Sequence, residues 1–182
     1  MGVQTAFFTV VFACFSLIAA PEAAARVEDV RVGVSAHNVL DDEDKEGGAN
    51  VETDIVFSSP RALKIIGGPR PFATASVNTQ GDTSAIAAGL SWRVPLGARW
   101  AIAPELALAA HNGEADDADA GGRRVLYGSR IVFRSAIAVE RRINERFAAQ
   151  VFAAHYSNGG LFGSDRNQGS ESVGVRLVIR MR

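Results

Sequence analysis

Apolar and polar residues alternate along most of the chain after Arg26. A period of two is typical of β-strands whose two faces meet different environments. Eight strand-like runs can be counted, which cover residues 30–36, 51–57, 71–79, 86–94, 100–108, 131–139, 147–153 and 173–181. All of them alternate except the third, residues 71–79, which is nearly featureless. No segment in this part of the chain has a convincing helical period. The pattern therefore predicts an all-β fold made of eight antiparallel strands.

The connections between these runs alternate in length. Residues 94–99 and 141–145 are short turns, whereas residues 41–50, 111–124 and 158–170 are longer, polar and rich in glycine. Short turns at one end and longer loops at the other are typical of an up-and-down outer-membrane barrel. A barrel of eight strands is just wide enough for side chains to fill its interior. We therefore expect a transmembrane β-barrel without an open pore.

The two faces of the predicted strands differ in chemistry. One face is almost purely aliphatic and is expected to meet lipid, with Trp92 and Trp100 in an aromatic girdle beside a short turn. The other face would fill the interior with mixed charge from Arg31, Glu52, Asp54, Arg93, Glu105, Arg134, Glu140, Arg176 and Arg180. The alternative is a soluble lipocalin-like barrel or sandwich with its apolar face inward. The even number of strands and the aliphatic outer face favour the membrane barrel.

The N-terminal segment has the pattern of an export signal. An apolar run over residues 6–20 is shorter than the roughly 20 residues that a transmembrane helix needs. It is followed by Pro-Glu-Ala-Ala-Ala, which offers a small-residue cleavage site before Arg26. We expect residues 1–25 to be a Sec signal peptide and residues 26–182 to be the outer-membrane β-barrel domain. Because the first five residues lack Lys and Arg, a membrane anchor or a buried helix is the alternative.

Composition narrows the chemistry further. The 19 Lys and Arg residues balance the 20 Asp and Glu residues, which argues against a nucleic-acid partner. The single cysteine, Cys14, excludes disulfide frameworks and multi-cysteine metal sites, and three histidines make a histidine cluster improbable. We therefore expect neither a metal nor a cofactor.

Three reactive residues fall on the lipid-facing side of the last two runs. The apolar face of residues 147–153 continues into His155 and Ser157, and that of residues 173–181 runs back to Glu171. Such groups in a membrane protein are by default candidates for function. An imidazole can take the proton of a serine hydroxyl, and a carboxylate can orient the imidazole. The arrangement predicts a hydrolytic triad; the alternative is a set of polar interface residues at two strand ends.

Amide groups that could stabilise an oxyanion follow the serine directly. Asn158, Gly159, Gly160 and Asn167 offer side-chain amides and unhindered backbone N–H groups. Asp165 lies in the same connection and is a rival to Glu171 as the orienting carboxylate, although a solvated loop carboxylate is the better interpretation.

The C-terminal part of the chain resembles the PagL-type lipid A 3-O-deacylases, also called acyloxyacyl hydrolases. The resemblance rests on His-Tyr-Ser-Asn-Gly-Gly-Leu at residues 155–161 and Asn-Gln-Gly-Ser-Glu-Ser at residues 167–172. Weaker support comes from Arg-Pro at residues 70–71, residues 78–84, Gly-Leu-Ser-Trp at residues 89–92 and His-Asn-Gly at residues 111–113. The connection between residues 161 and 167 is about two residues longer than in the family pattern, and the first third of the chain matches nothing in it.

This resemblance implies an eight-stranded outer-membrane barrel that removes the ester-linked 3-hydroxyacyl chain at position 3 of lipid A. It implies Ser157 as nucleophile, His155 as base and Glu171 as orienting acid, with oxyanion donors at the Asn167 side chain and the Gly160 backbone. The expected partner is lipid A, or lipopolysaccharide, of the outer leaflet, and a homodimer is left open. The competing hypothesis is a non-catalytic small barrel with a structural, adhesion or stress-response role.

Other polar residues are expected to serve structure. His37 and His111 fall on the inward face, where hydrogen bonds at the barrel end are the favoured interpretation. The acidic segments 41–44 and 114–117 are expected to be solvated, because Ca²⁺ needs six or more oxygens in a set geometry. Contacts of Arg123, Arg124 and Arg130 with lipid A phosphates are left open.

Overall fold

The computed structural model describes residues 26–40, 45–115, 122–160 and 167–181. The predicted signal peptide lies outside these residues and stays a prediction. The strands are β1 (Val27–His37), β2 (Ala49–Phe57), β3 (Arg70–Asn78), β4 (Ala85–Ser91), β5 (Val94–Leu96), β6 (Trp100–His111), β7 (Ile131–Arg142), β8 (Phe147–Ser157) and β9 (Ser170–Arg180).

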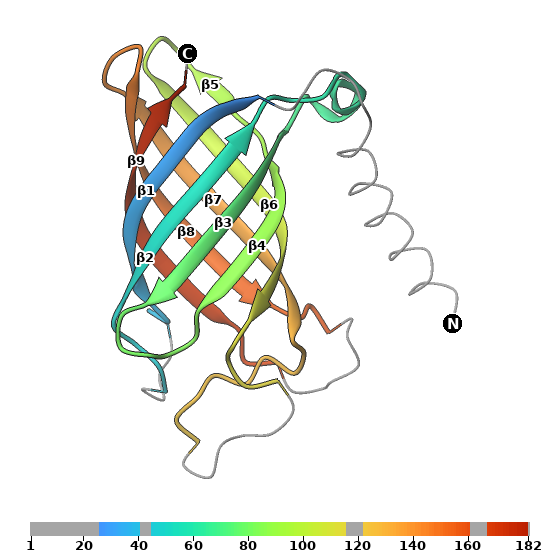
Figure 1. The fold of residues 1–182 in the computed structure, drawn as a ribbon, viewed down its shortest axis with the longest axis vertical. Helices are drawn as coiled ribbons and strands as arrows, with labels where there is room; N and C mark the ends of the chain where they lie inside the picture. The colour runs from blue at the N-terminus through green and yellow to red at the C-terminus, as the bar shows by residue number, and fades with distance from the viewer. Residues whose placement is uncertain (1–25, 41–44, 116–121, 161–166, 182) are drawn as a thin grey trace.

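The strands form one closed antiparallel barrel (Figure 1). Consecutive strands pair from β1 to β4 and from β5 to β9, while β1 pairs with β9 and β4 with β6 to complete the wall. Both β4 and β5 pair with β6 in one register, because Ser91 faces Glu105 and Val94 faces Ile102. They are therefore two parts of one strand of the wall, and the predicted eight-stranded barrel is confirmed.

A proline explains why the fourth strand is divided. Trp92 donates its backbone N–H to the carbonyl oxygen of Pro104 at 2.9 Å. Pro104 has no N–H to return, so one rung of the ladder between β4 and β6 is missing at this point. The alternation of residues 86–94 did not reveal this break, because it arises on the partner strand.

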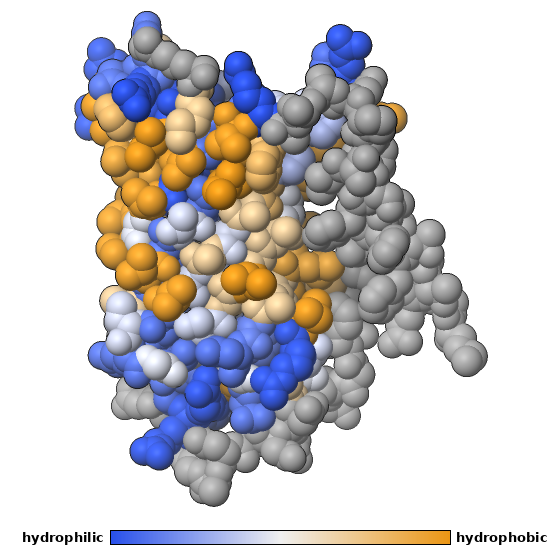
Figure 2. Space-filling view, viewed as in Figure 1, coloured by the Kyte–Doolittle hydropathy of each residue, from blue (hydrophilic) through white to orange (hydrophobic). Residues whose placement is uncertain are grey.

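The apolar face of the strands lies outward, as predicted for a membrane barrel. Branched aliphatic side chains such as Val34, Val151 and Val175 are exposed on the wall. Figure 2 shows apolar residues over the middle of the wall and hydrophilic residues at both of its ends. This is the reverse of a lipocalin-like barrel. In the described part of the chain, no helix is both long and apolar enough to cross a membrane.

A charged network fills the interior, with Glu105 at its centre. The Glu105 carboxylate accepts hydrogen bonds from three buried guanidinium groups, those of Arg31, Arg134 and Arg176. Arg176 also donates to Asp54 at 2.7 Å. The predicted inward charges are confirmed, except that Arg93 and Arg180 are partly exposed near one end, where both donate to Glu140.

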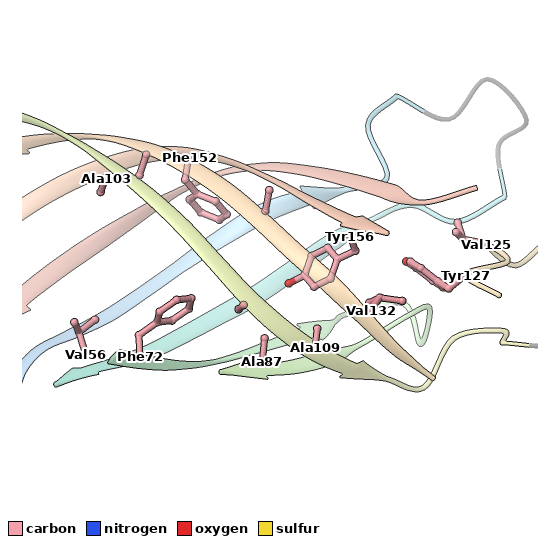
Figure 3. Packing of buried hydrophobic residues seen from close by; sticks show 13 residues of the cluster. Val56, Phe72, Ala87, Ala103, Ala109, Val125, Tyr127, Val132, Phe152 and Tyr156 are labelled. Atoms are coloured by element: carbon pink, nitrogen blue, oxygen red, sulfur yellow. The ribbon is translucent and has the colours of Figure 1, made fainter. Parts of the chain in front are cut away.

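Aromatic rings inside the barrel pack beside this network. Phe72, Phe152 and Tyr156 point into the interior (Figure 3). The Arg176 guanidinium lies 4.7 Å from the centre of the Phe152 ring, and Arg134 donates to the Tyr156 hydroxyl. The interior is thus filled by paired charges and rings, which agrees with a barrel without a pore.

Replacing Glu105 by glutamine is expected to destabilise the barrel strongly. The variant would keep the side-chain volume but leave three buried guanidinium groups without their shared anion, and breaking a buried pair costs about 3–5 kcal/mol. Urea unfolding of the protein in lipid vesicles measures this change. The control is Glu28→Gln, because Glu28 is partly exposed and lies 3.7 Å from Arg70. Equal unfolding midpoints for the two variants would contradict a central role for Glu105.

The two ends of the barrel differ in their connections. The loop end carries residues 38–48, 79–84, 112–130 and 158–169, and the turn end carries residues 58–69, 97–99 and 143–146. Two turns at the turn end are short, as predicted. Residues 58–69 are longer and contain a 3₁₀ helix, η1 (Arg61–Ile66), which the strand pattern did not predict. Long loops lie on the outer side of such barrels, so the loop end is the outer one.

Candidate active site

His155 and Glu171 face each other across the last two strands of the barrel. They are direct partners in the register between β8 and β9, at the loop end. Both side chains lie on the outer face, where His155 is 47% and Glu171 is 30% exposed. Nδ1 of His155 lies 2.9 Å from Oε1 of Glu171. The predicted convergence of these two residues is confirmed. Glu171 contacts Nδ1 of the imidazole and not Nε2, the other ring nitrogen.

Ser157 is the last residue of β8 and lies on the same face of that strand. Its Oγ accepts hydrogen bonds from Nδ2 of Asn167 at 2.7 Å and from the N–H of Gly159 at 3.0 Å. In this structure the hydroxyl of Ser157 and the imidazole of His155 are not hydrogen-bonded to each other. Strand geometry places side chains two residues apart roughly 6–7 Å from one another. Proton transfer between them therefore requires the two side chains to rotate toward each other.

The Asn167 side chain is held in place by the turn after Ser157. Its Oδ1 accepts the backbone N–H of Asn158 at 3.2 Å, which directs Nδ2 toward the Ser157 hydroxyl. Gly159 and Gly160 have φ angles of 63° and 68°, a left-handed conformation that favours glycine. This turn therefore presents amide donors to Ser157 in a defined direction.

Asn158 and Gly160, two further predicted donors, are engaged within the turn. The Asn158 side chain is buried; its Nδ2 donates to the carbonyl oxygen of Tyr127 at 2.9 Å, and its Oδ1 accepts the N–H of Gly160 at 2.7 Å. The Asn158 side chain thus ties the turn to the connection between β6 and β7. Gly160 would have to release this bond before donating to a substrate.

The connection between β6 and β7 also holds the chain next to Asn167, which the sequence did not predict. Gln168 and Leu126 exchange two hydrogen bonds, from the N–H of Gln168 to the Leu126 carbonyl oxygen and from the N–H of Leu126 to Oε1 of Gln168, both at 2.9 Å. The hydroxyls of Tyr127 and Ser170 lie 2.7 Å apart next to this pair. These contacts fasten the chain immediately after Asn167. Residues 126 and 168 are distant in the sequence, and no local pattern signals their pairing.

The buried side chain of Glu46 joins three of the outer connections. Its carboxylate accepts hydrogen bonds from the N–H groups of Thr83 and Val125, and it pairs with His37 at 2.9 Å and Arg124 at 3.4 Å. Burial alone would raise the pKa of Glu46, but hydrogen bonds from His37, Thr83 and Val125 outweigh it and lower the pKa. Glu46 therefore holds Val125, the residue next to Leu126, in place.

Replacing Glu46 by glutamine is expected to loosen the outer connections. Hydrogen bonds to a charged group contribute about 1.5–3 kcal/mol, so the protection of the Thr83 and Val125 amides from hydrogen exchange should fall about tenfold or more. Because folding lowers the Glu46 pKa, its stabilisation is present above the unfolded pKa of about 4.3 and is lost as the pH falls through the lower folded value. Only the wild-type protein should show this loss. Glu114→Gln, in the connection between β6 and β7, is the control; an equal effect there would contradict the prediction.

A shallow apolar groove of about 410 Å³ adjoins His155 and Glu171 on the outer wall. Ala153 lies in it between Ile137 and Val173, which are its partners on the two neighbouring strands. Val39 and Leu40, just after β1, also line the groove. Sequence reasoning missed this groove, which could accept one acyl chain beside the imidazole.

Ser135 is another residue that sequence reasoning missed. It lies opposite His155 on β7, on the exposed face of the wall, and lines the same groove. A signal for it was present, because a serine interrupts the aliphatic face of residues 131–139 as His155 interrupts that of β8.

The other predicted polar residues have structural partners where they are described. His37 contacts Glu46, and its Nδ1 also lies 3.3 Å from Nδ2 of Asn50. Nε2 of His111 lies 2.7 Å from the carbonyl oxygen of Ser129. Hydrogen bonding at the barrel end is confirmed for both histidines. Arg130 donates to the Gly113 carbonyl oxygen at 2.6 Å. The contacts of Arg123, Arg124 and Arg130 with lipid A phosphates, which the sequence left open, are not tested by this structure.

Some predictions lie outside the described residues. These concern Asp165, residues 41–44, and residues 116 and 117. Within the described part of the chain, no group of three or more His, Cys, Asp or Glu side chains could hold a metal ion.

Solved structures of other proteins are similar to this chain. The solved structure of the outer membrane enzyme PagL is similar over 84% of this chain and 99% of its own, with a TM-score of 0.57 and 17% identity. The outer membrane protein Ail of Yersinia pestis (TM-score 0.49, 7% identity) covers 86% of this chain and 100% of its own. Neisserial surface protein A (TM-score 0.48, 8% identity) covers 87% and 100%. A comparison with curated proteins gave no match.

The family comparison is more specific. Residues 86–180 match the family described as lipid A 3-O-deacylase (PagL), over more than half of the chain. The matching stretch contains His155, Ser157 and Glu171, and the barrel fold and the family together imply an outer-membrane location. The chain therefore belongs to the lipid A 3-O-deacylase (PagL) family.

Proposed function

We propose that this protein is a serine esterase that hydrolyses the ester-linked 3-hydroxyacyl chain at position 3 of lipid A. One observation carries the proposal: the His155–Glu171 pair lies on the lipid-facing wall beside Ser157, whose hydroxyl is held by two N–H donors. A histidine and a carboxylate on a lipid-facing wall cost free energy, and such residues in membrane proteins mark functional sites. Sec export of the chain is part of the same proposal.

The first half of the reaction forms an acyl-enzyme. Glu171 orients His155 through Nδ1, so that Nε2 can accept the proton of the Ser157 hydroxyl as Oγ attacks the ester carbonyl. Nδ2 of Asn167, which donates to Oγ at 2.7 Å, would turn to the oxyanion that then develops. When the tetrahedral intermediate collapses, the bond to the sugar oxygen breaks, and Nε2 returns the proton to that oxygen.

The second half of the reaction releases the fatty acid. A water molecule gives a proton to Nε2 of His155 and attacks the acyl carbonyl, after which the bond to Oγ breaks and Ser157 regains its proton. The groove beside Ala153 extends along the wall from the imidazole and would hold the acyl chain at the height of the outer leaflet. The reaction uses the chain's own side chains and water.

Mass spectrometry of lipid A after incubation with the purified, detergent-solubilised protein tests the proposal. We expect the loss of one 3-hydroxyacyl chain and the appearance of the matching free 3-hydroxy fatty acid. An unchanged lipid A mass with a folded barrel would contradict the proposal and favour a non-catalytic structural or adhesion role.

Replacing Gly169 by alanine is expected to reduce deacylation by about tenfold or more, since even a shift of about 1 Å at an active site can cost a hundredfold. Gly169 has a φ of 70°, and a Cβ there would lie 3.0 Å from the Tyr156 carbonyl oxygen and 3.1 Å from Cε1 of His155. The imidazole and the Tyr156 carbonyl oxygen would have to give way by a few tenths of an ångström. The initial rate of fatty-acid release measures the loss.

Gly97→Ala is the matched control for this prediction. Gly97 lies in a turn at the opposite end, with a φ of 75° and no atom within 4 Å of an added Cβ. It imposes the same backbone cost without contact with the site. Equal activity in the two variants would show that the space around His155 is not limiting.

A further inference from the structure

The connection between β2 and β3 carries an apolar helix that packs little against the barrel. Helix η1 (Arg61–Ile66) projects sideways from the wall at the turn end (Figure 1). None of its six residues is buried. Ile65 is 91% exposed, more than any other large apolar side chain that the structure describes, and Ile66 is also exposed. Water is an unfavourable environment for two adjacent isoleucines.

The position of η1 is defined by its flanking residues. Pro60 precedes it, and Gly67 and Gly68 end it in the left-handed conformation, with φ angles of 90° and 66°. The N–H groups of these glycines donate to the carbonyl oxygens of Lys64 and Leu63. This is a regular helix end. The isoleucines are therefore exposed on a helix whose two ends are well defined.

Trp92 connects η1 to the lipid-facing wall. Its indole Nε1 donates to the carbonyl oxygen of Ile66 at 2.9 Å. Trp92 is followed by β5, where Val94 and Leu96 are exposed on the outside of the barrel. The isoleucines of η1 thus continue the apolar surface of the wall at its turn end. Tryptophan is enriched at this depth, where its ring meets both acyl chains and water.

The charges of η1 fit a lipid headgroup layer. Arg61 and Lys64 are exposed on the helix, which contains no acidic residue. A short element that combines isoleucines with cationic side chains is suited to the boundary between headgroups and acyl chains. The same side chains can reach phosphate while their stems lie along apolar surface.

We propose that η1 is a membrane-interface anchor for the leaflet at the turn end of the barrel. Ile65 and Ile66 enter the boundary with the acyl chains, while Arg61 and Lys64 contact anionic phospholipid headgroups. In the order of strands around the wall, β3 and β4 lie across the barrel from β8. The anchor is therefore on the opposite side and at the opposite end from His155. Its insertion would set the tilt of the barrel, and with it the depth of the outer wall of β8.

Depth-dependent fluorescence quenching tests this inference without any activity assay. A single thiol is introduced as Ile65→Cys in the full chain carrying Cys14→Ser, labelled with an environment-sensitive fluorophore and folded into vesicles of phosphatidylcholine and phosphatidylglycerol. Val94→Cys on β5 reports a lipid-facing position, and Ala98→Cys at the tip of the next turn reports an aqueous one. We expect lipids brominated near the headgroup end of the acyl chain to quench the label at residue 65 comparably to that at residue 94.

The outcomes separate lipid from other occupants. Quenching at residue 65 as weak as at residue 98 would overturn the inference. The inference would also be overturned if the label at residue 65 were shielded from water only at a high protein-to-lipid ratio. A second copy of the chain would then be what covers η1. Arg61→Ser with Lys64→Ser should reduce the quenching at residue 65 only in vesicles that contain phosphatidylglycerol. Because Ile65 is exposed, the labelled protein should keep the gel mobility of the folded barrel.

Discussion

Replacing Ser157 by alanine should abolish deacylation while the barrel remains folded, and His155→Ala should do the same. If the two side chains form one nucleophilic unit, loss of either leaves no activated oxygen, and the rate should fall by about three orders of magnitude or more. The double variant should then be little worse than either single one, because members of such a unit are not additive. Release of 3-hydroxy fatty acid from lipid A, measured over hours, gives the residual rates.

The matched control for the serine is Ser59→Ala. Ser59 lies in the connection before η1, at the turn end, far along the wall from His155. It should keep the wild-type rate, with the same mobility of folded protein on an unheated SDS gel. Wild-type turnover in Ser157→Ala would refute the nucleophile assignment. Losses from His155 and Ser157 that simply multiply in the double variant would show that they act independently.

The wall of the barrel could be predicted from the sequence because all but one of the strand-like runs alternate with a period of two. One face of a strand such as β1 or β9 meets lipid and requires apolar side chains. The other face meets a narrow charged interior and requires polar ones. The break at Trp92 was hidden, because it arises from Pro104 on the partner strand. Helix η1 could not be predicted either, because six residues are too few to show a helical period. Its position depends on the two glycines that follow it and on the contact with Trp92.

Part of the candidate site could also be predicted from the sequence and part could not. The pairing of His155 with Glu171 follows from strand parity, because a single connection joins two adjacent antiparallel strands and both residues interrupt an aliphatic face. The hydrogen bond from Asn167 to Ser157 depends on how the loops pack. Gln168 meets Leu126 from another connection, and Glu46 holds the residue beside it. Such long-range contacts between irregular segments leave no periodic trace in a sequence.

Replacing Glu171 by glutamine is expected to lower the deacylation rate about a hundredfold to ten-thousandfold, as loss of the orienting carboxylate does in serine hydrolases. Glutamine keeps the shape of the side chain and an oxygen near Nδ1 of His155, but it removes the charge that stabilises the imidazolium formed during attack. Glu171→Asp should retain part of the activity, because the charge remains while the reach shortens by one methylene. Initial rates at saturating lipid A in detergent micelles distinguish the three proteins.

Asp165 supplies the decisive comparison for this assignment. Asp165 belongs to the same connection as Asn167, and this connection is longer than in the resembling family pattern. Its carboxylate is the rival orienting group that the sequence offers. The 2.9 Å contact with His155 and the direct cross-strand register favour Glu171. We therefore expect Asp165→Ala to retain near-normal turnover and Glu171→Ala to lose most of it. The reverse result, with both proteins folded, would transfer the orienting role to Asp165 and leave Glu171 as a polar residue at the membrane interface.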